Sequence, residues 1–141
     1  EYAARAGTTT AYANPYSFDA ANSVIDGGFN SNLAAMGWYI WNDTNGGYTS
    51  GNKPVAQKQA NRWGLYDMHG NVWEWCRDWY DYYAPGVITD PVGPADGTSR
   101  VFRGGCWHEN ARYARSAKRN AMAPDGRSNL NGFRLVLSAV Q

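Results

Sequence analysis

The sequence predicts a loop-rich α+β domain with little regular secondary structure. Sixteen Gly among 141 residues, together with frequent Asn and Asp, favour turns over long helices. Seven Trp and ten Tyr supply much of the 43% hydrophobic content, so we expect a core built from rings more than from Leu and Ile. A chain of this length forms one domain and buries a sizeable core.

The elements expected in the first part of the chain are short. The opening EYAARAG, residues 1–7, is typical of the last turns of a helix that ends with Gly7 in a C-cap role. Residues 8–51 are rich in Asn, Gly, Ser and Thr, which predicts long ordered loops and one short helix near Ala20 to Val24. Because loops of this length usually carry a site or bind an ion, we expect this region to contribute to function.

Two strands are predicted in the second half. The segment RVFR, residues 100–103, predicts a short strand that a Gly-Gly pair ends. Near the C-terminus, NGFRLVLSAV alternates so that Phe133, Leu135 and Leu137 share one face. Since the other face also carries an apolar residue, we expect this last strand to be buried on both sides.

Charge and cysteine usage exclude several classes of function. The formal net charge is +1, so no global field directs the chain to nucleic acid or to a membrane surface. Cys76 and Cys106 are predicted to be buried free thiols. Two thiols alone do not form a structural zinc site, and neither His69 nor His108 has zinc-finger spacing with them. We expect His69 to be a turn residue that bonds within its own loop, and His108 to be exposed.

Four linked motifs follow one another along the chain: GLYDMHGNVWEW at residues 64–75, RVFRGGCW at 100–107, RYARSAKR at 112–119 and GFRLV at 132–136. In this order they resemble the sulfatase-modifying, formylglycine-generating enzyme superfamily. The resemblance covers residues 1–141 as a single domain, and the N-terminal part of the family domain is absent from this chain. It implies a variant of the C-type lectin fold, with small antiparallel sheets and long ordered loops.

The superfamily divides by function, so the resemblance alone does not choose an activity. Some members are copper-dependent oxidases that convert a sulfatase cysteine to formylglycine, and others form carbon–sulfur bonds beside a separate iron-binding domain. A third group comprises ligand-binding scaffolds, including the variable proteins of diversity-generating retroelements. The side chains of the site must decide among these activities.

The residues after the Gly-Gly pair argue against copper chemistry. Copper-type relatives carry the form GGS-aromatic-x-Cys-x4-Cys, and two thiolates suit Cu(I). Here Glu109 and Ala114 stand at the two thiolate positions, and Cys106 stands at the usual Ser position. Alanine cannot bind a metal and a carboxylate is a hard ligand, so we expect no copper of that kind. If the chain is an enzyme, it is an oxidoreductase acting on a thiol substrate at a nonstandard site, with the candidate catalytic residues Cys106, His108, Glu109 and Trp73.

A structural calcium is implied by the resemblance at the turn of residues 67–74. Asp67 and Glu74 would supply carboxylate oxygens, and Gly70 and Val72 would supply backbone carbonyls. Calcium prefers several hard oxygens from a tight loop that contains Gly, so these residue types suit it. The alternative is that Asp67 and Glu74 accept hydrogen bonds from backbone N–H groups of the same turn without a metal.

Two further expectations follow from the family motifs. Most Lys and Arg residues fall between Arg100 and Arg134, where motif arginines typically pair with buried carboxylates and carbonyls. We therefore expect ion pairs between the motif arginines and nearby carboxylates, and no nucleic-acid partner. The expected arginines are Arg103, Arg115, Arg119 and Arg134, and the expected carboxylates are Asp67, Glu74 and Asp78. A second family calcium site would fall in the loop of residues 42–45, although this loop departs from the family pattern.

The last third of the chain alternates framework motifs with positions that are mostly small or polar, and several of these are Asn. In variable proteins of diversity-generating retroelements, Asn codons at such places are mutated on a rigid lectin-like face near the C-terminus. The leading interpretation is therefore a noncatalytic module that binds a protein or carbohydrate ligand on a stable scaffold. The expected ligand contacts are Trp107, His108, Glu109, Asn110, Asn120, Asp125, Asn129 and Asn131.

Three functions stay open from the sequence: a ligand-binding or interaction module of variable-protein type, a metal-dependent oxidoreductase with a nonstandard site, and a structural component of a larger assembly. We expect calcium as a structural cofactor. We expect no membrane span, since no apolar run has the required length. The sequence does not fix the compartment or the oligomeric state, although an extracellular or cell-surface location is favoured.

Overall fold

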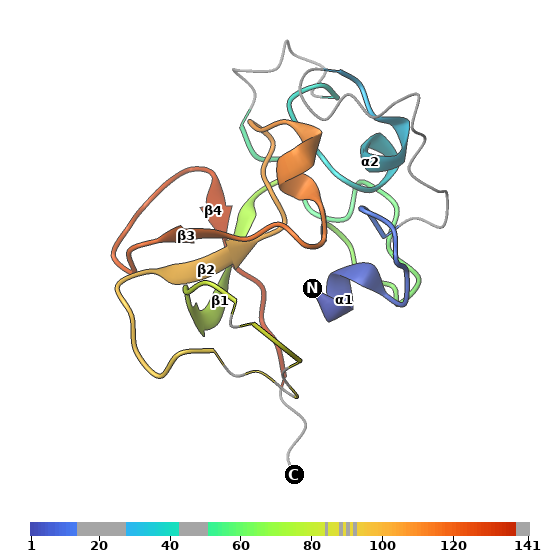
Figure 1. The fold of residues 1–141 in the computed structure, drawn as a ribbon. Coiled ribbons are helices and arrows are strands. Elements are labelled where there is room, and N and C mark those ends of the chain that lie inside the picture. The colour runs from blue at the N-terminus through green and yellow to red at the C-terminus, as the bar shows by residue number, and fades with distance from the viewer. Residues whose placement is uncertain are drawn as a thin grey trace.

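The computed structural model describes residues 1–13, 28–42, 51–83, 85–87, 89, 91 and 93–137. The short helix predicted near Ala20 to Val24 and the loop predicted to hold a second calcium after Asn42 lie outside these residues. Within the described part, two short α-helices and a 3-10 helix lie beside a four-stranded sheet (Figure 1). None of these helices is both long and apolar enough to cross a membrane.

Both α-helices begin or end at residues with a specific capping role. α1, Tyr2–Arg5, is followed by Ala6 in the left-handed conformation at φ 45° and by Gly7 at φ 85°. This confirms the predicted helix end, although the left-handed turn begins one residue before the glycine. α2, Ser31–Met36, begins after Asn30, whose side-chain oxygen accepts a hydrogen bond from the backbone N–H three residues later.

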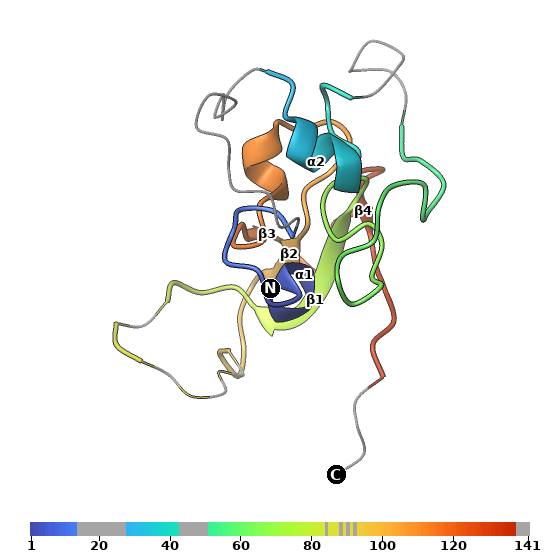
Figure 2. The same ribbon diagram turned by 90° about the vertical axis from the view of Figure 1, so that its right-hand side faces the viewer.

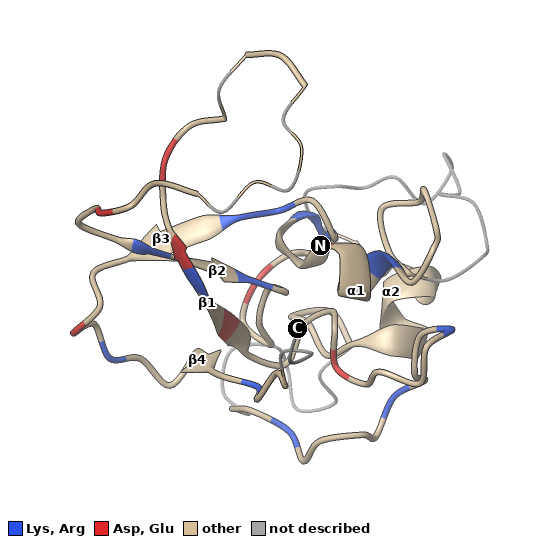
Figure 3. Ribbon diagram, turned by 90° about the horizontal axis from the view of Figure 1, so that it is seen from below, with Lys and Arg blue, Asp and Glu red and all other residues tan. Residues whose placement is uncertain are grey.

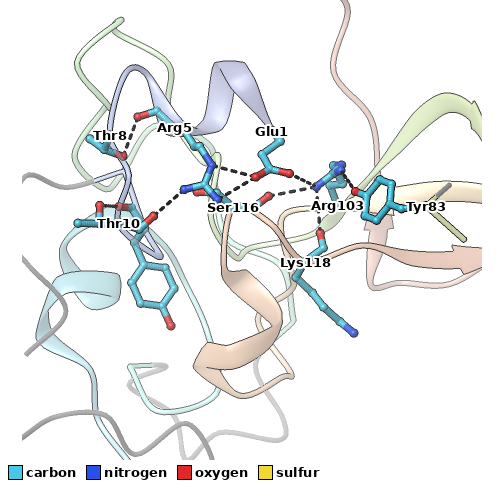
Figure 4. A network of polar contacts seen from close by, with 9 residues as sticks. Glu1, Arg5, Thr8, Thr10, Tyr83, Arg103, Ser116 and Lys118 are labelled. Atoms are coloured by element: carbon cyan, nitrogen blue, oxygen red, sulfur yellow. Dashed lines mark hydrogen bonds and ion pairs between the residues drawn. The ribbon is translucent and has the colours of Figure 1, made fainter. Parts of the chain in front are cut away.

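A polar network ties α1 to the second half of the chain (Figure 4). The guanidinium of Arg5 donates to the Glu1 carboxylate at 2.9 Å, and Arg103 lies 3.6 Å from the other oxygen of that carboxylate. Arg103 also donates to the Ser116 carbonyl at 3.1 Å and to the Tyr83 hydroxyl at 3.4 Å. The arginine therefore links the sheet to α1 and to the loop after the 3-10 helix.

The sheet contains four strands in the order β3-β2-β1-β4. β1 spans Trp73–Trp79, β2 spans Arg100–Arg103, β3 spans Asn120–Met122 and β4 spans Asn131–Gly132. The predicted strand at residues 100–103 is confirmed with those bounds. β2 is antiparallel to both β1 and β3, but β4 runs parallel to β1. The sheet is thus mixed rather than antiparallel throughout, and Figure 2 shows it from a second side.

The last predicted strand is wrong in both its length and its burial. β4 ends at Gly132, and Phe133, Leu135 and Leu137 are 76%, 90% and 97% exposed. In Figures 1 and 2 this segment leaves the body of the molecule and leads toward the C-terminus. β4 is an edge strand, with no further strand of the described chain beside it. The alternating apolar side chains therefore have no surface to pack against, which is why the predicted burial of this strand is wrong.

Two clusters of buried side chains form the core. The first joins α2 to the 3-10 helix η2, Ala111–Ala114, and contains Tyr12, Leu33, Tyr39, Ile40, Ala111 and Ala114. The second lies on the sheet and contains Trp73, Phe102 and Cys106. The rings of Trp73 and Phe102 meet edge to face with their centroids 4.8 Å apart. Aromatic rings therefore fill much of both clusters.

Candidate functional site

The loop before β1 is positioned by a close backbone crossing with the segment after α2. A Cβ atom on Gly70 would lie 2.1 Å from the Trp38 carbonyl oxygen, and one on Gly37 would lie 1.8 Å from the His69 carbonyl oxygen. The Asn71 N–H donates to the Trp38 carbonyl at 2.8 Å. Gly70 also has φ 74°, where residues with a Cβ are strained. Only glycine fits at both positions, and the crossing holds the predicted calcium turn against the first core cluster.

His69 is a buried tether between distant segments, so the predicted bond within its own loop is wrong. Its side chain is fully buried, and Nε2 accepts a hydrogen bond from the Ala13 N–H at 3.0 Å. The other ring nitrogen, Nδ1, lies 2.7 Å from the Ala114 carbonyl oxygen, to which it donates in the neutral tautomer. Burial lowers the pKa of His69 to about 4, so the ring stays neutral at physiological pH.

The four predicted calcium ligands line one cavity of about 350 Å³. Asp67 is buried and adopts φ 56°, and its Oδ2 accepts a hydrogen bond from the Ala56 N–H at 2.7 Å. Its Oδ1 is buried without a hydrogen-bond partner in the described chain. Gly70, Val72 and Glu74 line the same cavity. A buried carboxylate oxygen without a partner is costly, so this side of the cavity fits a hard cation.

Glu74 is already held by a cation of the protein itself. Arg134 donates to both of its carboxylate oxygens at 2.5 Å, as expected for a motif arginine. The same guanidinium donates to the carbonyls of Tyr66 at 3.1 Å and Asp67 at 3.2 Å. The hydrogen bonds to Glu74 raise the pKa of Arg134. Among the described residues, no group of three or more His, Cys, Asp and Glu side chains is arranged for a metal.

The structure does not bear out the capping interpretation. Oδ2 of Asp67 accepts an N–H from Ala56, which lies outside the turn of residues 67–74, and Glu74 bonds a guanidinium rather than backbone N–H groups. A calcium ion would rely on Oδ1 of Asp67 and on the carbonyls of Gly70 and Val72, and it would share Glu74 with Arg134.

The loop of residues 106–110 places a buried thiol beside a carboxyl group. Burial and the neighbouring Glu109 carboxyl raise the pKa of Cys106 to about 12. Burial also raises the pKa of Glu109, which hydrogen-bonds with Cys106 and Trp73 and whose Oε2 is buried without a partner in the described chain. Cys76 and Cys106 are both free, as predicted, but only Cys106 is buried, and Cys76 is half-buried. Three of the four candidate catalytic residues thus gather here, and the ring of the fourth, His108, meets the Trp107 ring edge to face.

Main-chain hydrogen bonds hold this loop in place. The Trp107 N–H donates to the Asn71 carbonyl at 2.8 Å, and the Ile40 N–H donates to the Glu109 carbonyl at 3.2 Å. A third bond runs from the Glu109 N–H to the Cys106 carbonyl at 3.3 Å. Backbone groups make these bonds whatever side chains the loop carries.

The predicted ligand contacts differ in their exposure. Asp125 and Asn129 are exposed, whereas Trp107 is only 5% exposed and packs beneath the surface. The Asn131 amide donates to the sulfur of Met122 at 3.4 Å, which brings the two edges of the curled sheet together. The remaining predicted contacts are half-buried: His108, Glu109, Asn110, Asn120 and Asn131.

One surface aromatic beside this loop was not among the predicted contacts. Trp41 is 49% exposed, and its indole N–H donates to the Asn110 side-chain oxygen at 3.1 Å. These two residues are 69 positions apart in the sequence, so no local pattern marks Trp41 among the seven Trp. A ring that is half exposed and oriented by a hydrogen bond is typical of ligand contacts.

Known proteins resemble this chain over most of its length. A family model described as the sulfatase-modifying factor enzyme 1-like domain matches residues 1–139. The chain is 44% identical over 91 residues to a serine/threonine-protein kinase pkn1 of Chlamydia caviae, and this match covers 62% of this chain and 15% of that protein. It is 42% identical over 91 residues to the formylglycine-generating enzyme of Streptomyces coelicolor, covering 61% of this chain and 29% of the enzyme. The chain therefore spans less than a third of the length of these curated relatives.

Two solved structures share the fold. Treponema denticola variable protein 1 has a TM-score of 0.74 and 32% identity, covering 94% of this chain and 42% of that chain. PvdO from Pseudomonas aeruginosa has a TM-score of 0.70 and 28% identity, covering 94% of this chain and 47% of that chain. The four motifs, the small curled sheet and these relatives agree, and the predicted superfamily with its C-type-lectin-like fold is confirmed. The chain belongs to the sulfatase-modifying factor enzyme 1-like family.

Proposed function

We propose that this chain is a noncatalytic ligand-binding module of the kind found in variable proteins of diversity-generating retroelements. The observation that carries the proposal is the separation of scaffold and surface in the loop of residues 106–110. Main-chain bonds and buried residues hold the loop, while His108 and Asn110 are partly exposed at its surface. Substitution at such positions changes the binding surface while the main-chain bonds that hold the loop stay in place.

The similarity to Treponema denticola variable protein 1 supports this proposal. The two proteins are 32% identical, and the match covers 94% of this chain. A variable protein needs a framework that keeps its shape while surface side chains change. Asp125 and Asn129 are exposed, so they are suitable positions for such changes. A protein or carbohydrate ligand would contact this face, and an extracellular or cell-surface location would suit such a role.

The chemistry of the thiol supports the noncatalytic part of the proposal. With its pKa raised to about 12, Cys106 is a protonated thiol at neutral pH and is a weak nucleophile. Ala114, at the second position where copper-type relatives carry a thiolate, is 1% exposed and packs in the first core cluster. The pair of soft donors that suits Cu(I) is missing.

Two matched libraries test the proposal. In the surface library, residues 108, 110, 125 and 129 are randomised together; in the control library, four residues of the two core clusters are randomised. We expect most members of the surface library to fold, because a substitution changes the stability by about 0.5 kcal/mol or less at the exposed positions 125 and 129 and by about 1 kcal/mol at the half-buried positions 108 and 110. We also expect selection on immobilised proteins and glycans to yield binders. A surface library that unfolds as often as the control library would contradict the proposal.

An oxidoreductase acting on a thiol substrate is the second candidate, because Cys106, Glu109 and Trp73 gather around one point. The discriminating experiment incubates the chain with a cysteine-containing peptide and either Cu(I) or Fe(II), and measures oxygen uptake and aldehyde formation. The binding proposal expects no turnover. Turnover that Cys106→Ser abolishes would establish the enzyme instead.

We propose in addition that calcium binds at the turn of residues 67–74 as a structural ion. The partnerless Oδ1 of Asp67 supports this, and Gly70 and Val72 line the same cavity. A calcium concentration of 100 times the Kd would stabilise the fold by about 2.7 kcal/mol. We expect calcium to raise the Tm in a differential scan, magnesium to raise it less, and Asp67→Asn to abolish the increase. An equal Tm in calcium and in a chelator would contradict the site.

A further inference from the structure

A second cavity lies at the opposite end of β1 from the calcium turn. Its volume is about 620 Å³, and its lining includes Arg77, Asp78 and Trp79 of β1, Arg100 of β2, and the loop residues Pro91 and Pro94. Cavities of this size accommodate small ligands or single side chains of a larger partner. None of these residues belongs to the calcium turn or to the proposed binding face.

Arg100 is held in a fixed orientation within this cavity. Its guanidinium carbon lies 3.4 Å from the centroid of the Trp79 ring, and its Nη1 donates to the Arg77 carbonyl oxygen. Stacking on the indole fixes the plane of the guanidinium, and one carbonyl fixes its rotation. The Nε and Nη2 donors have no acceptor among the described residues. The protein therefore presents an oriented fork of donors that its own described residues leave unused.

Two further charged groups line the cavity without partners in the described chain. Arg77 and Asp78 are both exposed, and neither side chain makes a hydrogen bond or an ion pair with the residues that the structure describes. Figure 3 shows acidic and basic segments next to each other along β1. With two guanidinium groups and one carboxylate, the cavity carries a local charge of +1.

We propose that this cavity binds a ligand that carries a carboxylate next to a hydrogen-bond donor. A guanidinium fork matches the planar carboxylate with two parallel N–H···O bonds. Asp78 can accept the neighbouring donor, and it disfavours a dianion such as phosphate by repulsion. The Trp79 ring and the two prolines supply apolar walls. An Asp or Glu residue of a peptide and a sugar acid both offer this combination.

Calorimetric titration of the whole chain tests the proposal with three probes. The probes are the capped peptide acetyl-Gly-Asp-Gly-amide, glucuronate and inorganic phosphate. We expect saturable binding of the peptide, the sugar acid or both, and at least tenfold weaker binding of phosphate. Tighter binding of the peptide identifies a protein source, and tighter binding of glucuronate identifies a carbohydrate source. Absence of saturable binding, or phosphate binding as tight as that of the carboxylates, would overturn the proposal.

Variants connect the binding to this cavity. Arg77→Gln should weaken the affinity at least tenfold, and Arg100→Lys should do the same because it keeps the charge but loses the fork. Arg127→Gln is the matched control, since Arg127 is exposed and lies outside the cavity. If Arg100→Lys does not fold, the exposed Arg77 variant still decides. Unchanged affinity in Arg77→Gln, or an equal loss in Arg127→Gln, would overturn the assignment. The result is independent of the library experiment on the proposed binding face.

Discussion

The charged side chains at the start of β1 form an ion pair, whereas those at its end form none within the described chain. Near its start, Glu74 is bound at both oxygens by Arg134, and the same guanidinium bonds two loop carbonyls. Near its end, the side chains of Arg77 and Asp78 make no hydrogen bond or ion pair in the described chain, although they are neighbours on the same strand. The two ends differ in the segments that lie beside them. Residues from several separate segments surround the start of β1, whereas a loop that contains Pro and Gly borders its end. A closed ion pair therefore marks the start of β1, and side-chain donors that the described chain leaves unused mark the end where we propose the ligand cavity.

The largest effect is expected from Gly70→Ala, near the start of β1. The new Cβ would lie 2.1 Å from the Trp38 carbonyl oxygen, at φ 74°. Since neither backbone can move without breaking the crossing, we expect a loss of about 4 kcal/mol or more in the free energy of unfolding, or failure to fold. Gly64→Ala is the control, because Gly64 has φ 77° but nothing within 4 Å. It should cost only about 1–2 kcal/mol of left-handed strain. Similar losses in urea unfolding of both variants would remove the argument for the crossing.

The next effect concerns the pH dependence of the His69 tether. Its pKa is lowered to about 4 in the folded chain against 6.5 in the unfolded chain, so the unfolded chain binds the proton more readily. Stability from this group is complete above pH 6.5, falls as the pH drops toward 4, and changes no further below that value. We expect a total loss of about 3 kcal/mol over this window, from about 1.4 kcal/mol per pKa unit.

The measurement for His69 is urea unfolding at pH 7, 5.5 and 4. His69→Gln should flatten the curve, because the amide does not titrate, while His108→Gln should leave the slope of the parent. If the parent loses no more stability than His69→Gln over this range, the buried neutral tether is refuted.

A double-mutant cycle on Glu74 and Arg134 should give a smaller effect. The pair is half-buried, with side-chain exposures of 32% for Arg134 and 20% for Glu74. We expect a coupling free energy of about 2 kcal/mol from Glu74→Gln, Arg134→Gln and the double variant, because either single change leaves a partly buried group unpaired. Denaturation at low and high salt gives the comparison, and coupling below about 0.5 kcal/mol would place the pair among ordinary surface contacts.

The same cycle at the other end of β1 should give the smallest effect. Arg77→Gln, Asp78→Asn and their combination should each change the free energy of unfolding by about 0.5 kcal/mol or less, with coupling near zero. Both side chains are exposed, and neither makes a hydrogen bond or an ion pair with the described residues. A large loss of stability in Arg77→Gln would show that this end of the strand is structural as well, and the comparison between the two ends would fail.

Local sequence patterns were sufficient where neighbouring residues decide the structure. The end of α1 near Gly7 and the strand at residues 100–103 depend on backbone preferences of a few consecutive residues, and both were found. The motif resemblance added the family, and it placed Arg134 and Glu74 among the residues expected to form ion pairs. It did not single out this pair, which is 60 positions apart, and the side chains of Asp67 and Asp78 form no ion pair within the described chain.

Three features were beyond any local pattern. His69 bonds residues 56 and 45 positions away, and the Trp41 contact spans 69 positions. The alternation at Phe133 and Leu135 identifies the two faces of an extended segment, but burial depends on whether a second surface lies opposite. Each of these depends on tertiary contacts, which single-chain periodicity does not encode.

Because the two thiols differ in burial, they should react with an alkylating reagent at different rates. Cys76 is half-buried on β1, whereas Cys106 is 1% exposed beneath the Trp73 and Phe102 rings. An alkylating reagent should modify Cys76 first, and it should reach Cys106 only when a transient local opening separates those rings. The rate at which Cys106 is modified therefore reports how often the second core cluster opens in the native protein.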